Sequence, residues 1–127
     1  MKNTHIFLIL LIMFSCSPRI IKSESDNLEF SSGNKRIKIE ILSDSKFIDR
    51  ENPTKISIKG ENIEVENLAY SSYFGFKLVD KDFENNTYII DFNPKIGEVK
   101  TEKFEFSISF VEDNKTIIHK FLIPWKS

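Results

Sequence analysis

The chain has 127 residues, of which 40% are hydrophobic and 29% charged, and its formal net charge is −1 at pH 7. Charges of both signs are interspersed, and no basic stripe could neutralise phosphates, which excludes nucleic-acid binding. The single cysteine cannot form a disulfide within the chain, so the fold must rest on the hydrophobic core of one domain.

The first 15 residues predict a secretory signal peptide. Lys2 precedes nine uncharged apolar residues, 6–14, and the small residue Ser15 follows them. This apolar segment is shorter than the roughly 20 residues that a membrane-spanning helix needs. Removing residues 1–15 leaves 112 residues with 17 basic and 19 acidic side chains, a net charge of −2.

Cys16 follows the apolar segment directly and is the only cysteine. This arrangement resembles the bacterial lipobox, in which the cysteine is acylated, for example with palmitate, and becomes the mature N-terminus. The resemblance implies a membrane lipoprotein of the cell envelope, anchored at Cys16. Ser17 stands where Asp commonly retains lipoproteins in the inner membrane, which favours the outer membrane. The alternative is an ordinary secretory signal with an incidental cysteine.

Residues 16–34 are polar and lack hydrophobic periodicity, with serines, charges and Gly33. They predict a flexible tether that follows the lipidated cysteine, within which residues 28–30 could add a short edge strand. The folded domain is therefore expected to span residues 35–127.

Strict alternation of apolar and polar residues begins at Lys35, where Ile37, Ile39 and Ile41 share one face. Period two predicts a strand with one buried face. Similar strands are expected further along the chain, separated by turn residues: 47–48, 56–58, 63–65, 73–79 with Gly75 as a bulge, 88–92, 104–110 and 116–123. The pattern has no convincing helix. It predicts an all-β, immunoglobulin-like antiparallel sandwich of seven or eight short strands, preceded by the signal-peptide helix and the tether. A small barrel is the alternative architecture.

Two stretches, residues 47–60 with Asn52-Pro53 and residues 88–99 with Asn93-Pro94 and Gly97, are similar to the C-terminal domain of the gliding-motility protein GldM. Residues 121–124 fit the exit of that domain. The resemblance implies an immunoglobulin-like fold and a bacterial envelope setting. It brings no catalytic residues and no motor coupling, because the transmembrane helix and other domains of the family have no counterpart in the sequence.

No group of residues predicts catalysis, a metal or a cofactor. His119 is the only histidine left after signal removal, and nothing in the sequence places an acid or a nucleophile beside it. We interpret it as one polar position on a strand. The acidic groups Asp80, Asp82, Glu84 and Glu112-Asp113 lie among turn residues, and the first group lacks the glycine and terminal glutamate of a calcium loop.

Five aromatic residues are candidates for binding a partner. The densest aromatic run contains Tyr70, Tyr73, Phe74 and Phe76, and Trp125 stands near the C-terminus. The simpler interpretation of the run is core and rim of the sandwich. Trp125 either packs over the open end of the sandwich or forms a second contact point.

We therefore expect a non-enzymatic, membrane-anchored lipoprotein that binds another envelope protein through an edge strand or the 70–76 region. The alternative is a small-ligand-binding or inhibitor protein with a Phe-lined pocket between the sheets. An enzyme would require His119 to cluster with two acids in a cleft. The sequence leaves the oligomeric state open.

Overall fold

The structure, a computed structural model, describes residues 19–49, 52–72, 75–93 and 103–126. These residues form ten strands and one short 3₁₀ turn, so the predicted all-β class is confirmed. In chain order the elements are β1 (Arg19–Ser25), β2 (Glu29–Ser32), β3 (Lys35–Ile41), β4 (Ile48–Asp49), β5 (Thr54–Glu61), η1 (Val65–Asn67), β6 (Ala69–Ser72), β7 (Phe76–Asp82), β8 (Thr87–Phe92), β9 (Lys103–Glu112) and β10 (Lys115–Lys126).

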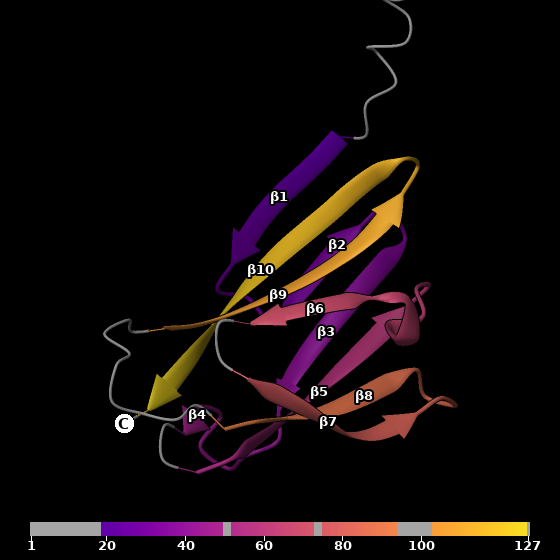
Figure 1. The fold of residues 1–127 in the computed structure, drawn as a ribbon. Helices are drawn as coiled ribbons and strands as arrows, with labels where there is room; N and C mark the ends of the chain where they lie inside the picture. The colour runs from indigo at the N-terminus through magenta and orange to yellow at the C-terminus, as the bar shows by residue number, and fades with distance from the viewer. Residues whose placement is uncertain (1–18, 50–51, 73–74, 94–102, 127) are drawn as a thin grey trace, which may run out of the picture.

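The strands form two sheets that pack as a sandwich (Figure 1). The first sheet has the order β1-β10-β9-β6, with the short β4 also pairing with β10. The second sheet has the order β2-β3-β5-β8-β7. Pairing is antiparallel except for β1 and β4, which both run parallel to β10. Since each sheet ends in edge strands, the architecture is a sandwich and not a closed barrel.

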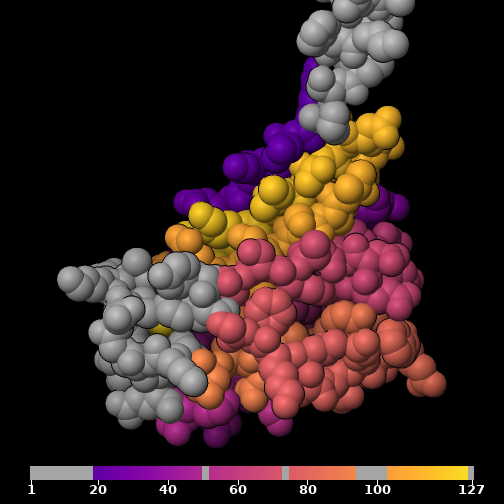
Figure 2. All heavy atoms as spheres, viewed as in Figure 1, coloured from indigo at the N-terminus to yellow at the C-terminus, as the bar shows by residue number. Residues whose placement is uncertain are grey.

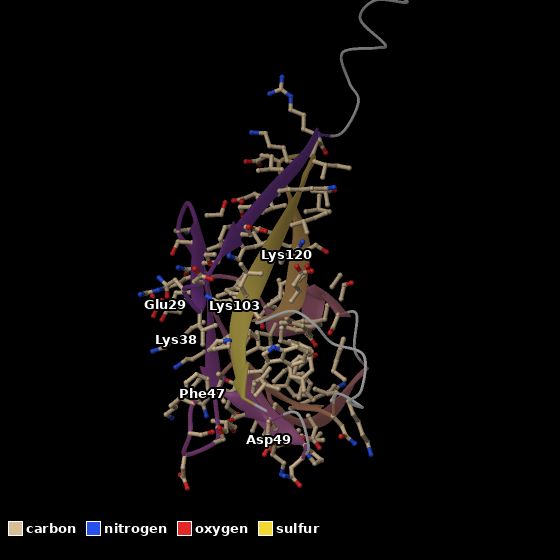
Figure 3. The ribbon with its side chains drawn as sticks, turned by 90° about the vertical axis from the view of Figure 1, so that its left-hand side faces the viewer. Glu29, Lys38, Phe47, Asp49, Lys103 and Lys120 are labelled. Atoms are coloured by element: carbon tan, nitrogen blue, oxygen red, sulfur yellow. The ribbon has the colours of Figure 1, made fainter. Side chains whose placement is uncertain are left out.

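The alternating residues build the core as predicted. Ile37, Ile39 and Ile41 are buried, while the charged residues between them face solvent. Between the sheets, the Phe92 ring meets those of Phe104 and Phe106 at centroid distances of 4.6 and 5.3 Å. Burying such a side chain fully is worth about 1.5–3 kcal/mol. Figure 3, turned by 90°, shows the two layers edge-on, with Glu29 and Lys38 on the outer side of the second sheet.

Residues 19–34, which we expected to belong to a flexible tether, are part of the folded domain. β1 pairs along its whole length with β10, and β2 pairs with β3. The prediction was wrong here because six of the seven residues of β1, an edge strand, are exposed, so its sequence lacks the alternation of a strand with one buried face. The eight strands from Lys35 onward agree with the predicted number, and the sandwich begins at Arg19.

The strand expected at residues 63–65 is replaced by the turn η1. Asn86, in the β7–β8 turn, causes the difference. Its side-chain amide donates to the carbonyl oxygens of Gly60 and Ile63 at 2.8 and 2.6 Å, and its side-chain oxygen accepts from Val65 N at 2.9 Å. These bonds use the groups that a strand would need for its ladder. The chain then crosses to β6 in the first sheet.

Candidate functional site

The predicted partner-binding run lies where the chain passes from β6 to β7. Tyr70 on β6 and Phe76 at the start of β7 are both half-buried against the core. Each ring contacts Phe106, Tyr70 stacked at 6.0 Å and Phe76 edge-on at 5.7 Å. Tyr73 and Phe74 lie outside the described residues.

The hydroxyl of Tyr70 donates a 2.7 Å hydrogen bond to the carbonyl oxygen of Val65. Burial, together with the nearby Tyr88, raises the pKa of Tyr70 well above its ordinary value. The phenol therefore stays protonated and ties β6 to the η1 turn. Tyr70 and Phe76 therefore lie at the border of the core, half-buried, which agrees with the core-and-rim interpretation for these two residues.

Trp125 is a core residue, only 8% exposed. Its ring packs on Phe104 at 5.9 Å, and its backbone pairs with Ile48 where β4 joins β10. Of the two roles considered for Trp125, the structure places it in the packing role, at the end of the sandwich near β4. A ring buried in this way offers almost no surface to a partner.

The structure adds three exposed apolar residues to the predicted region. Leu78 and Val79 on β7 are 38% and 42% exposed, and Phe83 in the following turn is 61% exposed. β7 is an edge strand, and its register shifts between Leu78 and Asp80. We name the set Tyr70, Phe76, Leu78, Val79 and Phe83 the β6–β7 surface; Figure 2 shows these two strands on the face turned to the viewer.

Sequence reasoning missed this extension because strict alternation assigns either Leu78 or Val79 to the core. An edge strand has a neighbour on one side only, and the register shift turns consecutive side chains outward. Lys77, Asp80 and Lys81 lie beside the apolar residues and are exposed as well. Such charges are typical of edges that natural proteins protect from indiscriminate strand pairing.

A second cluster joins His119 to two serines of β1. The parallel register places Ser23 opposite His119, so the side chains share the inner face. Ser23 Oγ lies 2.6 Å from Nδ1 of His119, and Ser25 Oγ lies 2.9 Å from Nε2. Ser25 also donates its hydroxyl hydrogen to the carbonyl oxygen of Asn27 at 2.8 Å.

These contacts define the tautomer of His119. The hydroxyl hydrogen of Ser25 is used on Asn27, so Ser25 Oγ accepts from Nε2–H. Nδ1 is then unprotonated and accepts from the hydroxyl of Ser23. The imidazole is 4% exposed and stacks on Phe30 at 4.2 Å. Burial lowers the pKa of His119 below its ordinary value, which favours this neutral form.

This arrangement has a structural role, because it attaches β1 to β10. Both ring nitrogens of His119 are occupied by serine hydroxyls, so no carboxylate orients the imidazole as in a catalytic triad. The hydrogen bonds instead hold β1 to β10 and satisfy a buried polar side chain. Sequence reasoning could not find the serines, since they are 96 and 94 residues from His119 and become neighbours only through the parallel pairing.

The acidic groups act as turn and surface residues. Asp82 accepts hydrogen bonds from the backbone and side chain of Asn85 at 3.2 and 2.7 Å, and these bonds lower its pKa. Glu112 forms an ion pair with Lys35 at 3.1 Å. Among residues 19–49, 52–72, 75–93 and 103–126, no three His, Cys, Asp or Glu side chains gather in a way that could hold a metal ion.

The described part of the chain also contains no helix long and apolar enough to cross a membrane. Cys16 lies outside the described residues, so its lipidation stays a prediction from the sequence. Comparisons of the chain with protein-family models, with curated proteins and with solved structures find no match.

Proposed function

We propose that the chain is a non-enzymatic lipoprotein of a bacterial envelope, anchored by a lipid on Cys16, whose sandwich binds another envelope protein through the β6–β7 surface. The proposal that the sandwich binds a partner rests on the exposure of Leu78 and Val79 on the edge strand β7 and of Phe83 in the turn that follows it. Grouped apolar side chains on an edge favour pairing with an extended segment of a partner. The lipobox and the absence of Asp after Cys16 support the anchor and an outer-membrane location.

The position of this surface supports the same proposal. β1 begins three residues after Cys16 and starts beside the β9–β10 turn, while β7 and β8 lie at the other end of the domain (Figure 1). An anchor at Cys16 would therefore leave the β6–β7 surface away from the bilayer. A partner in the same compartment could then reach this surface without displacing lipid.

The alternative, a ligand pocket between the sheets, receives no support from the packing. Phe92, Phe104, Phe106 and Phe121 are fully buried, and the Phe92 ring contacts the rings of both Phe104 and Phe106. A hollow of about 490 Å³ opens instead at the surface, next to η1, and both polar and apolar side chains line it, among them Asn62, Glu64 and Val111. Side chains thus occupy the space in which a Phe-lined pocket was expected.

Mass spectrometry of the mature N-terminus tests the anchor. We expect the chain to begin at Cys16 with an acylated cysteine, and the Cys16→Ser variant to remain unprocessed. A mature chain that begins elsewhere, or an unmodified Cys16, would remove the anchor from the proposal.

Site-specific photo-crosslinking in the native host tests the binding surface. A photoreactive amino acid at Val79 or Phe83 should give an adduct with one protein of defined mass. The matched control is the same amino acid at Lys59, which is exposed on the outer face of the second sheet. Equal adduct patterns at Val79 and Lys59 would contradict binding through the β6–β7 surface.

A further inference from the structure

One end of the first sheet projects beyond the second sheet. Figures 1 and 3 both show the start of β1 and the β9–β10 turn above the end of β2 and β3. We name residues 19–22 and 111–116 the protruding end. The second sheet contacts this part at Glu112, through Lys35 and Ser32, and side chains on both faces of the protruding end reach solvent.

Apolar side chains are exposed on both faces of the protruding end. The register places Ile20 beside Thr116 and Thr116 beside Val111, so these three residues form a row across the outer face. Ile20 is 63% exposed and Val111 71%. On the inner face, Ile21 is 44% exposed although its neighbour Ile117 is buried. Exposed apolar residues on neighbouring strands indicate a contact surface.

The charge of the protruding end differs from that of the whole chain. Arg19, Lys22 and Lys115 are exposed, and Arg19 lies directly opposite Lys115 in the β1–β10 pair. Like charges directly opposite each other on paired strands destabilise a sheet. Against these three cations stand Glu112, which pairs with Lys35, and the exposed Asp113, so the protruding end has a formal net charge of 3 − 2 = +1. An anionic surface would remove the repulsion between Arg19 and Lys115.

The chain length between the cysteine and the domain limits where this end can be. Three peptide units join Cys16 to Arg19. Consecutive Cα atoms are about 3.8 Å apart, so Cys16 and Arg19 lie within roughly 11 Å of each other in any conformation. Each polar headgroup layer of a bilayer is about 5–8 Å thick. Acyl chains on Cys16 would thus hold the start of β1 at the headgroups or immediately above them.

We propose that the protruding end docks on an anionic bilayer, with Ile20, Ile21 and Val111 entering the headgroup layer and Arg19, Lys22 and Lys115 contacting lipid phosphates. The proposal rests on the lipid anchor of the preceding section and deepens it. Basic residues near an anionic membrane strengthen binding to it, and inserted apolar side chains strengthen it further. The domain would then stand on the membrane with the β6–β7 surface directed away from it.

Tryptophan quenching by brominated lipid tests this orientation, because Trp125 is the only tryptophan and is buried near β4, at the other end of β10 from Lys115. The purified mature chain is reconstituted into vesicles of phosphatidylglycerol and phosphatidylethanolamine, with bromine near the headgroup end of the acyl chains. The Val111→Trp variant should lose emission relative to the same variant on unbrominated vesicles. The wild-type chain and the matched Phe83→Trp variant, exposed at the far end, should lose none.

The outcomes separate docking from anchoring. If the chain floats with the vesicles but Val111→Trp is quenched no more than Phe83→Trp, the anchor stands and docking is refuted. If the Val111→Trp signal is shielded from water yet unquenched by lipid, a second copy of the chain covers this end, and docking is refuted as well. A chain that neither floats nor is quenched contradicts both proposals. Arg19→Glu combined with Lys115→Glu should reduce the quenching of Val111→Trp while flotation persists.

Discussion

Replacing Asn86 with glycine tests how the chain passes from the second sheet to β6. The Asn86 side chain forms three hydrogen bonds, to the carbonyl oxygens of Gly60 and Ile63 and to Val65 N–H. The Asn86 backbone has φ of 49°, in the left-handed region that glycine tolerates without strain. Glycine therefore removes the three bonds and retains the backbone conformation.

The expected loss follows from these bonds. A hydrogen bond contributes a net ~1 kcal/mol, so three of them give a free energy of unfolding lower by about 3 kcal/mol. Glycine adds an entropic cost through the unfolded chain of up to about 1 kcal/mol. The Asn114→Gly variant carries the same entropic cost, because Asn114 has φ of 58° in the β9–β10 turn. The difference between the two variants isolates the side-chain bonds of Asn86.

Urea unfolding followed by circular dichroism measures both free energies of unfolding. We expect Asn86→Gly to be less stable than Asn114→Gly by about 3 kcal/mol. The loss should appear together with looser attachment of Tyr70, since Tyr70 binds Val65 within the same turn. Equal stability of the two variants would refute the view that Asn86 organises the η1 crossing.

Three further predictions concern the fold. Gly60→Ala should lower the free energy of unfolding by about 1–3 kcal/mol, because a Cβ there would meet the carbonyl oxygen of Ile63 and lie 2.9 Å from Asn86 Nδ2. The control is Gly75→Ala, which should be nearly neutral because the space around Gly75 is open. Phe106→Ala, at a fully buried ring, should cost about 3–5 kcal/mol in urea unfolding; a cost below about 1 kcal/mol would contradict the packing described. Since burial lowers the pKa of His119 below its ordinary 6.5, the unfolded chain binds more protons below that pH, and the melting temperature should fall as the pH drops from 7 through 6. That dependence should disappear in His119→Phe; if it persists there, His119 is not its source.

The local sequence determined most of the strands. Residues 37–41, 56–58 and 104–110 alternate cleanly because one face of each strand lies on the core and the other in water, and burial in the structure follows that pattern. Asn114 lies in the turn between β9 and β10 as expected, whereas Gly60, which was expected in a turn, lies within β5 and pairs with Ile37. The all-β sandwich follows from such local patterns, since strands with a single apolar face must pack against a second sheet.

The pairing of strands in the tertiary structure decided the features that the local sequence did not predict. The parallel pairing of β1 with β10 converts residues 19–25 from an expected tether into a strand and brings Ser23 to His119, a contact between residues 96 apart. The exposure of Leu78 and Val79 likewise depends on β7 being an edge with a shifted register. Hydrophobic periodicity reports whether a residue faces the core. It contains no information on which strand is the neighbour, because backbone hydrogen bonds between strands are the same for every sequence.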